Sequence, residues 1–183
     1  MRRLSSNLLF LAAFAAMVMV YPSRIEAADP ATQTTDIGTD SQAVPPVYAI
    51  SGQFERIVVL RFKYETDLLA GLENMVAKEK IRNAVILAGT GSVRNYHFHV
   101  VTNRTFPSTN VFVKDTTTPA DIAGMNGYVI DGRVHAHITL TDAAKAFGGH
   151  LEPGTNVFTF AIVTVGVFKE GMDLRRIDDK TYR

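Results

Sequence analysis

The sequence contains no cysteine, so no disulfide bond can stabilise the folded chain. Stability must therefore come from an apolar core, from self-association or from a bound metal ion. Positive charge is also scarce, because 19 Lys and Arg side chains are offset by 18 Asp and Glu and form no visible cluster. Nucleic-acid binding depends largely on clustered basic side chains that neutralise phosphates, so the composition argues against a nucleic-acid partner.

An apolar run long enough to cross a bilayer is missing as well. The run from Leu8 to Tyr21 has about 14 residues, whereas a spanning helix needs about 20. Arg2 and Arg3 precede this run and the small Ala27 follows it, which gives the three parts of a secretory signal in order. We therefore expect a signal peptide over residues 1–27, cleavage after Ala27 and a periplasmic or secreted mature protein. The alternative is a retained membrane anchor.

The remainder of the chain divides into a polar segment, a globular region and a short tail. Residues 28–46 are rich in Thr, Asp, Ser and Pro, so we expect a disordered tether. Residues 47–170 are long enough for one domain with its own apolar core, and residues 171–183 are expected to be a C-terminal tail. Without the signal, the chain has 16 basic and 17 acidic side chains, a net charge of −1 that again disfavours nucleic acid.

The globular region begins with a strand and a helix and continues mainly as strands. Arg56 to Lys63 is rich in β-branched residues, and Asp67 can cap a helix that ends near Lys80. Asp131-Gly132 is a typical two-residue hairpin turn. One early helix and many later strands predict an α+β fold with a mainly antiparallel sheet. The later strands are expected over residues 83–89, 93–101, 110–114, 128–130, 133–141 and 157–167.

The segment Ala88 to Arg94 (AGTGSVR) begins like the glycine-rich loop of a dinucleotide site. Arg94 stands where the third glycine of that fingerprint belongs, and the residues after it predict a strand instead of a helix. A pyrophosphate would therefore face no helix N-terminus, and we expect no nucleotide cofactor. The glycines are expected to allow a tight turn or close packing of the backbone.

Four of the five histidines form two H-x-H pairs, His97 with His99 and His135 with His137. Alternate residues of a strand project to the same face, so each pair can present two imidazoles to one metal ion. The alternative is a half-buried strand face whose histidines hydrogen-bond to neighbours. For His97 and His99, the alternatives are that they line the same cavity or that they pack within the sheet or at a subunit contact, and we favour packing.

The second pair is followed by a further histidine. Gly148-Gly149 directly precedes His150 and can let the backbone turn sharply, which would return a third imidazole toward His135 and His137. Three neutral imidazoles with a fourth position free for water form the donor set of an open zinc site. The alternative is that the glycines merely make a turn and leave His150 in solvent.

These motifs resemble the plant-and-prokaryote conserved (PPC) domain over most of residues 48–168. The likeness covers LRFKYETDLLAGLENMVAKEKIRNAVILAGTGSV and DGRVHAHITLTDAAKAFGGHLEPGT, in which H-x-H and GGHL are the most specific parts. The resemblance implies an α+β domain that assembles as a homotrimer and binds a metal, expected to be zinc, through His135, His137 and His150. Plant members bind DNA through an added Arg-Gly-Arg-Pro motif, which this sequence lacks.

More distantly, the sequence is similar to the zinc-dependent acetolactate decarboxylases, which use an H-x-H pair and one later histidine. Those enzymes also need positioned Arg and Glu partners, and Glu152, two residues after His150, is the one candidate catalytic residue that we identify. Three functions remain open: a binding module for a small ligand, a metal-dependent hydrolase or decarboxylase, and DNA binding by family alone. We favour the binding module, because no pattern in the sequence places an acid or base beside the metal.

Overall fold

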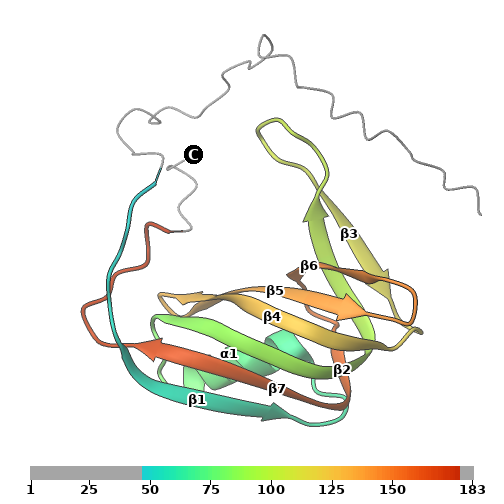
Figure 1. Cartoon of the computed structure of the whole chain (residues 1–183), viewed down its shortest axis with the longest axis horizontal. Helices are drawn as coiled ribbons and strands as arrows, with labels where there is room; N and C mark the ends of the chain where they lie inside the picture. Colours follow the sequence, from blue (N-terminus) through green and yellow to red (C-terminus); the bar gives the residue numbers. More distant parts are fainter. Residues whose placement is uncertain (1–46, 178–183) are drawn as a thin grey trace, which may run out of the picture. The chain divides into compact units, whose positions relative to one another are not determined.

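The computed structural model describes residues 47–177, which contain seven β-strands and one α-helix (Figure 1). The expected signal peptide and tether, and residues 178–183 of the expected tail, lie outside the described residues. The part of the chain that the structure describes holds no helix of membrane-spanning length and hydrophobicity. The elements are β1 (Phe54–Phe62), α1 (Leu68–Lys78), β2 (Ala84–Val101), β3 (Asn110–Asp115), β4 (Ala120–Ile130), β5 (Arg133–Thr141), β6 (Ala146–Leu151) and β7 (Asn156–Phe168).

All strand pairings between these elements are antiparallel, and the main path through the sheet has the order β1-β7-β2-β4-β5-β6. The second half of β2 leaves this order and pairs with β3 (Figure 1). It also pairs with β6, so β2, β4, β5 and β6 close into a ring of strands. This arrangement confirms the predicted α+β fold with a mainly antiparallel sheet.

The helix α1 forms where the apolar spacing predicts it. The Asp67 carboxylate accepts a hydrogen bond from the backbone N–H of Ala70 at 2.9 Å and so caps the first turn. Leu68, Leu72 and Val76 follow one side of the helix and are buried against the sheet. Full burial of each leucine stabilises the fold by roughly 2 kcal/mol. In Figure 1, α1 lies across one face of the sheet. The apolar core lies on this face, between the helix and the strands.

The alternation along β5 separates the core from the histidines. Ala136 and Ile138 are buried in the core on the face covered by α1. Because successive side chains of a strand point to opposite faces, His135 and His137 project to the other face. Their partners on β4 are Tyr128, opposite His135, and Asn126, opposite His137. The open face of the sheet therefore carries the H-x-H pair.

The break expected between strands 83–89 and 93–101 is absent, because β2 runs through both. Gly91 lies where the break was expected, inside β2. A Cβ at this position would lie 2.2 Å from the backbone oxygen of Phe160 on β7, so only glycine lets the two strands approach this closely. Of the two roles expected for these glycines, close backbone packing is therefore the one that the structure shows for Gly91.

The described part of the expected C-terminal tail packs against the domain. The Asn83 side chain donates a hydrogen bond to the backbone oxygen of Met172 at 2.6 Å, and Leu174 is buried. Met172 and Leu174 therefore pack against the domain although they follow its expected boundary at residue 170. Strand β4 begins at Ala120 and is therefore longer than the segment predicted for it, residues 128–130.

Candidate metal centre

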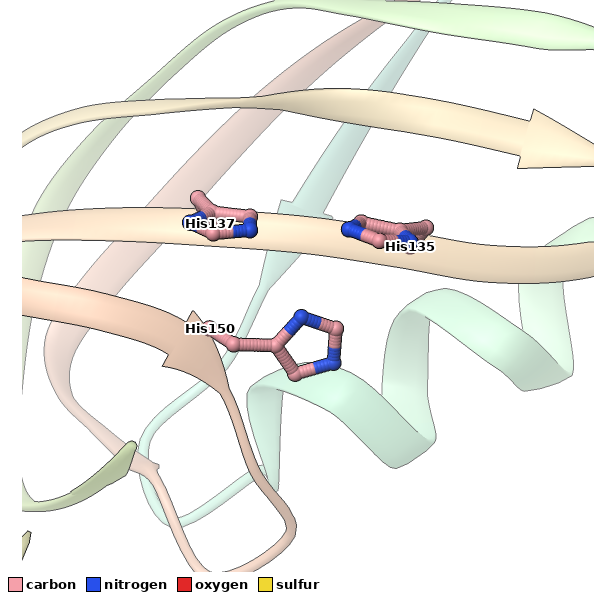
Figure 2. Close-up of side chains that lie close together, drawn as sticks. All are labelled: His135, His137 and His150. Atoms are coloured by element: carbon pink, nitrogen blue, oxygen red, sulfur yellow. The ribbon is translucent and has the colours of Figure 1, made fainter. Parts of the chain in front are cut away.

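Strand β6 places His150 directly beside the H-x-H pair of β5. The register pairs His137 with His150, so the two side chains lie on the same face of the sheet. Figure 2 shows His135 and His137 on β5 with the ring of His150 extending beside them from β6. The ring centroids are 5.5 Å apart for His135 and His137, 4.8 Å for His135 and His150, and 5.3 Å for His137 and His150.

The three imidazoles form a donor set that suits a metal ion. One ring nitrogen from each of His135, His137 and His150 lies within 4.8 Å of the other two. Tetrahedral zinc with Zn–N bonds near 2.0–2.1 Å requires nitrogens about 3.4 Å apart, so modest ring rotations would close the gap. The first two rings are nearly parallel, at 12°, and the third lies at 80° and 83° to them, so the donors approach from two directions.

The predicted role of Gly148 and Gly149 as a sharp bend is wrong, although the predicted approach of His150 to the pair is confirmed. Both glycines lie inside β6. The chain reverses earlier, where the Asp142 carboxylate accepts hydrogen bonds from the backbone N–H groups of Ala144 and Lys145, at 2.7 and 2.8 Å.

The two glycines instead allow close packing on both sides of β6. A Cβ on Gly148 would lie 2.0 Å from the backbone oxygen of Ile138 on β5. A Cβ on Gly149 would lie 2.3 Å from the backbone oxygen of His99 on β2. The diglycine therefore lets β6 fit between β5 and β2, which sets the position of His150.

Burial and neighbouring positive charge favour the neutral, metal-binding form of two of these histidines. Partial burial lowers the pKa of His150, and charge on His135, His99 and His137 lowers it further, while Glu152 acts in the opposite direction. Although His137 is exposed overall, partial desolvation of its ring lowers its pKa, with His135 and His99 adding to the effect. Metal binding requires deprotonated ring nitrogens, so both shifts favour it.

His99 joins this group from β2, a position that the sequence supported only as the less favoured alternative. The register pairs His99 with His150, and their rings stack with centroids 4.5 Å apart and an interplanar angle of 28°. The Nδ1 atom of His99 lies 2.5 Å from Oε1 of Glu152, whose carboxylate accepts the hydrogen bond. Glu152, the candidate catalytic residue, is therefore held at the edge of the histidine group.

His97 behaves as expected for a histidine packed in the sheet. Its Nδ1 donates a hydrogen bond to the backbone oxygen of Pro153 at 2.8 Å, and its ring lies 6.0 Å from that of Phe112. The long-range pairing of β2 with β6 is what separates the roles of His97 and His99. The only sequence signal for a role of His99 was the H-x-H spacing, and this spacing does not distinguish His99 from His97.

A hollow of about 400 Å³ adjoins the centre on the side of His137. Asn126 and Thr139 lie on the same face as His137 and supply polar side chains to its wall. Binding sites for small molecules commonly have volumes of roughly 300–1,000 Å³ and combine apolar walls with a few polar groups. The hollow is therefore of a suitable size for a small ligand next to the three imidazoles.

Comparison with known proteins relates this fold to one family. The model of the Plants and Prokaryotes Conserved (PCC) domain matches residues 49–169. The structure of a metal-containing protein from Archaeoglobus fulgidus has a TM-score of 0.61 and 22% identity, and the match covers 74% of this chain and 95% of that chain. A structure from Ralstonia eutropha JMP134, named for presumed DNA binding, has a TM-score of 0.50 and 23% identity over 63% and 80% of the two chains.

Acetolactate decarboxylase also has a similar structure, as the sequence resemblance led us to expect. The enzyme from Bacillus subtilis subspecies spizizenii has a TM-score of 0.43 and 12% identity over 66% of this chain and 54% of that chain. At this level the likeness supports no argument about activity. No protein with a curated description matches the sequence.

Proposed function

The chain belongs to the Plants and Prokaryotes Conserved (PCC, or PPC) domain family, and we propose that it is an exported, homotrimeric metal-binding module for a small ligand. The observation that carries this proposal is the convergence of His135, His137 and His150, whose donor nitrogens lie within 4.8 Å of one another. The metal-containing protein from Archaeoglobus fulgidus, which shares the fold, supports the same reading.

Zinc is the proposed metal. Three neutral imidazoles are a donor set that suits zinc, and an ion held by three protein ligands keeps one position for water or a ligand atom. When bound, such an ion supplies a positive charge and Lewis acidity that hold a carbonyl or carboxylate oxygen. The residues of this chain have the separate role of orienting the imidazoles, through the register of β5 and β6.

The proposed ligand site is the hollow beside His137. Asn126 and Thr139 can hydrogen-bond to a polar group of a ligand bound there. A ligand there would lie within reach of the open position on the metal. The polar side chains of Asn126 and Thr139 support a small organic ligand with at least one oxygen atom.

The open face of the sheet supports the proposed homotrimer. Ile57, Val59, Leu87 and Tyr128 are between 41% and 64% exposed in the single chain. The strand registers place Ile57, Val85, Tyr128 and His135 in one row across β1, β7, β2, β4 and β5. Apolar surface of this kind is a frequent sign of a protein interface. Other copies of the chain covering it would border the metal centre.

A metal-dependent hydrolase or decarboxylase is the second candidate function. The observation in its favour is the carboxylate of Glu152, which lies within 4.8 Å of donor atoms of both His99 and His150. Catalysis of either kind needs an acid or base beside the metal, and Glu152 is our candidate for that role. DNA binding is the weakest candidate, since the net charge of −1 expected for the mature chain provides little attraction for phosphate.

Metal analysis of purified mature protein tests the main proposal. Wild-type protein should retain about one zinc per chain, and the triple variant His135→Ala/His137→Ala/His150→Ala should retain none. Equal metal content in the two proteins would refute the metal-binding function. A subsequent screen of esters and of 2-keto and 2-hydroxy acids, with and without chelator, separates binding from turnover. Turnover that is abolished by Glu152→Gln would favour the enzyme.

A further inference from the structure

We propose that His99, His150 and Glu152 form a second metal seat, which overlaps the three-histidine centre and is called the overlapping seat below. One donor atom from each of these residues lies within 4.8 Å of the other two, the same limit that the three-histidine centre meets. This inference deepens the proposed function and rests on it, because it concerns which metal the same centre holds.

The strand registers build both sets around one residue. His150 of β6 lies opposite His137 of β5 on one side and opposite His99 of β2 on the other. Beyond β6 the backbone N–H of Glu152 donates to the backbone oxygen of His97 at 3.0 Å, which continues the pairing with β2. The side chain of Glu152 therefore lies on the same face as His150, two residues earlier.

The contacts of His99 bring its ring close to both other members of the seat. Its ring stacks on that of His150 at 4.5 Å and 28°, closer than the 5.5 Å between the parallel rings of His135 and His137. The side chains of His99 and Glu152 are only 19% and 21% exposed, so both are largely shielded from competing water.

In the metal-free arrangement, His99 Nδ1 lies 2.5 Å from Glu152 Oε1. Ligand atoms around one ion lie roughly 3 Å or more apart, so the pair must open slightly to admit it. Any ring proton on the nitrogen that binds is released to solvent, since imidazole binds metals through a free lone pair. No backbone change is required, because both residues are already on neighbouring extended segments.

The shared histidine makes the two seats mutually exclusive. A neutral imidazole offers one lone pair, so His150 can bind one ion at a time. The donor sets differ in chemistry: three imidazoles suit zinc, whereas two imidazoles and one carboxylate are typical of iron(II) centres, and oxygen donors also suit manganese(II). The centre would therefore hold one ion per chain and shift it toward Glu152 when that ion is manganese(II) or iron(II).

Titration of manganese(II) and zinc(II) into the metal-free double variant His135→Ala/His137→Ala tests the overlapping seat by calorimetry. This variant keeps His99, His150 and Glu152, so we expect about one manganese(II) per chain. Addition of Glu152→Gln should weaken that binding on the order of tenfold or more. Glu73→Gln in the same background is the matched control, because Glu73 is an exposed carboxylate on α1 and should leave binding unchanged.

The outcomes separate this inference from the proposed function. Metal binding by wild type with none by the double variant would overturn only the overlapping seat, whereas binding by neither would overturn both. If circular dichroism shows that the double variant does not fold, Glu152→Gln in the otherwise wild-type chain decides. It should weaken manganese(II) binding on the order of tenfold relative to zinc(II). An unchanged ratio of the two affinities would refute the inference.

Discussion

His150 and His137 lie directly opposite each other on β6 and β5, so their imidazoles share one face of the sheet. This relationship depends on register, because the side-chain period of a strand is two residues and a shift by one would turn His150 toward the core. The register in turn depends on the close approach of β6 to its two neighbours. The geometry of the candidate metal centre therefore depends on the glycines of β6 as well as on the histidines.

The substitution Gly149→Ala should disrupt this approach. Its Cβ would lie 2.3 Å from the backbone oxygen of His99, so β6 must move away from β2. We expect a loss of roughly 1–3 kcal/mol in the free energy of unfolding and weaker zinc binding. Urea denaturation and zinc titration measure the two effects. Gly124→Ala is the control, because no atom lies within 4 Å of a Cβ at that position on β4 and stability should change little.

Much of the centre was predictable because its residues follow local rules. The alternation of β5 places His135 and His137 on one face wherever the strand pairs, so the sequence alone predicts the H-x-H pair. The position of His150 was also expected, but for the wrong reason. A diglycine signals a bend as readily as a close approach between strands, and only the register of β6 with β5 and β2 distinguishes them.

The sequence did not distinguish His99 from His97, because the position of His99 beside His150 arises from a pairing between residues far apart in the chain. His99 and His150 meet only because β2 is long enough to pair with β4 in its first half and with β6 in its second. The sequence suggested a break in this strand near Gly91. The helix α1, by contrast, carries a local cap and a regular apolar spacing, and it formed within two residues of its expected end.

Stability of the metal-free protein should fall as the pH is lowered through about 6.5. Burial and neighbouring charges lower the folded-state pKa values of His137 and His150 from the ordinary value of 6.5, so the unfolded chain binds protons more readily. Above that pH both states are neutral at these sites and stability is unaffected. Below it, protonation favours unfolding until the pH passes the lowered folded values. Urea midpoints at pH 8 and pH 5 should show this loss.

The matched variant for the pH experiment is His137→Gln/His150→Gln, which removes both titrating groups. Its loss of stability between pH 8 and pH 5 should be smaller than that of the wild type. Asp115 and Asp142 have pKa values lowered from 3.8 by hydrogen bonds, so they remain ionised throughout this window and contribute equally to both proteins. An identical loss in both proteins would contradict the assignment of the effect to these histidines.

The exposed apolar face predicts the behaviour of a charged substitution. Val59 is 64% exposed on β1, and Val59→Asp would place a carboxylate on the surface that we propose is covered by other copies of the chain. Wild-type protein should sediment as a trimer and the variant as a smaller species, as measured by analytical ultracentrifugation. Val47→Asp is the control, since Val47 is 86% exposed and lies outside the strands. A monomeric wild type would refute the homotrimer.

Bound zinc should stabilise the folded chain in proportion to its affinity. A ligand that binds only the folded state adds RT ln(1 + [L]/Kd), about 2.7 kcal/mol at a free concentration one hundred times Kd. We therefore expect chelation to lower the melting temperature of wild-type protein, and expect no effect on the triple variant His135→Ala/His137→Ala/His150→Ala. The stabilisation should be larger at pH 8 than at pH 6, because protons compete for the ring nitrogens at the lower pH. Stabilisation that is equal at both values would show that the ion binds through groups other than these imidazoles.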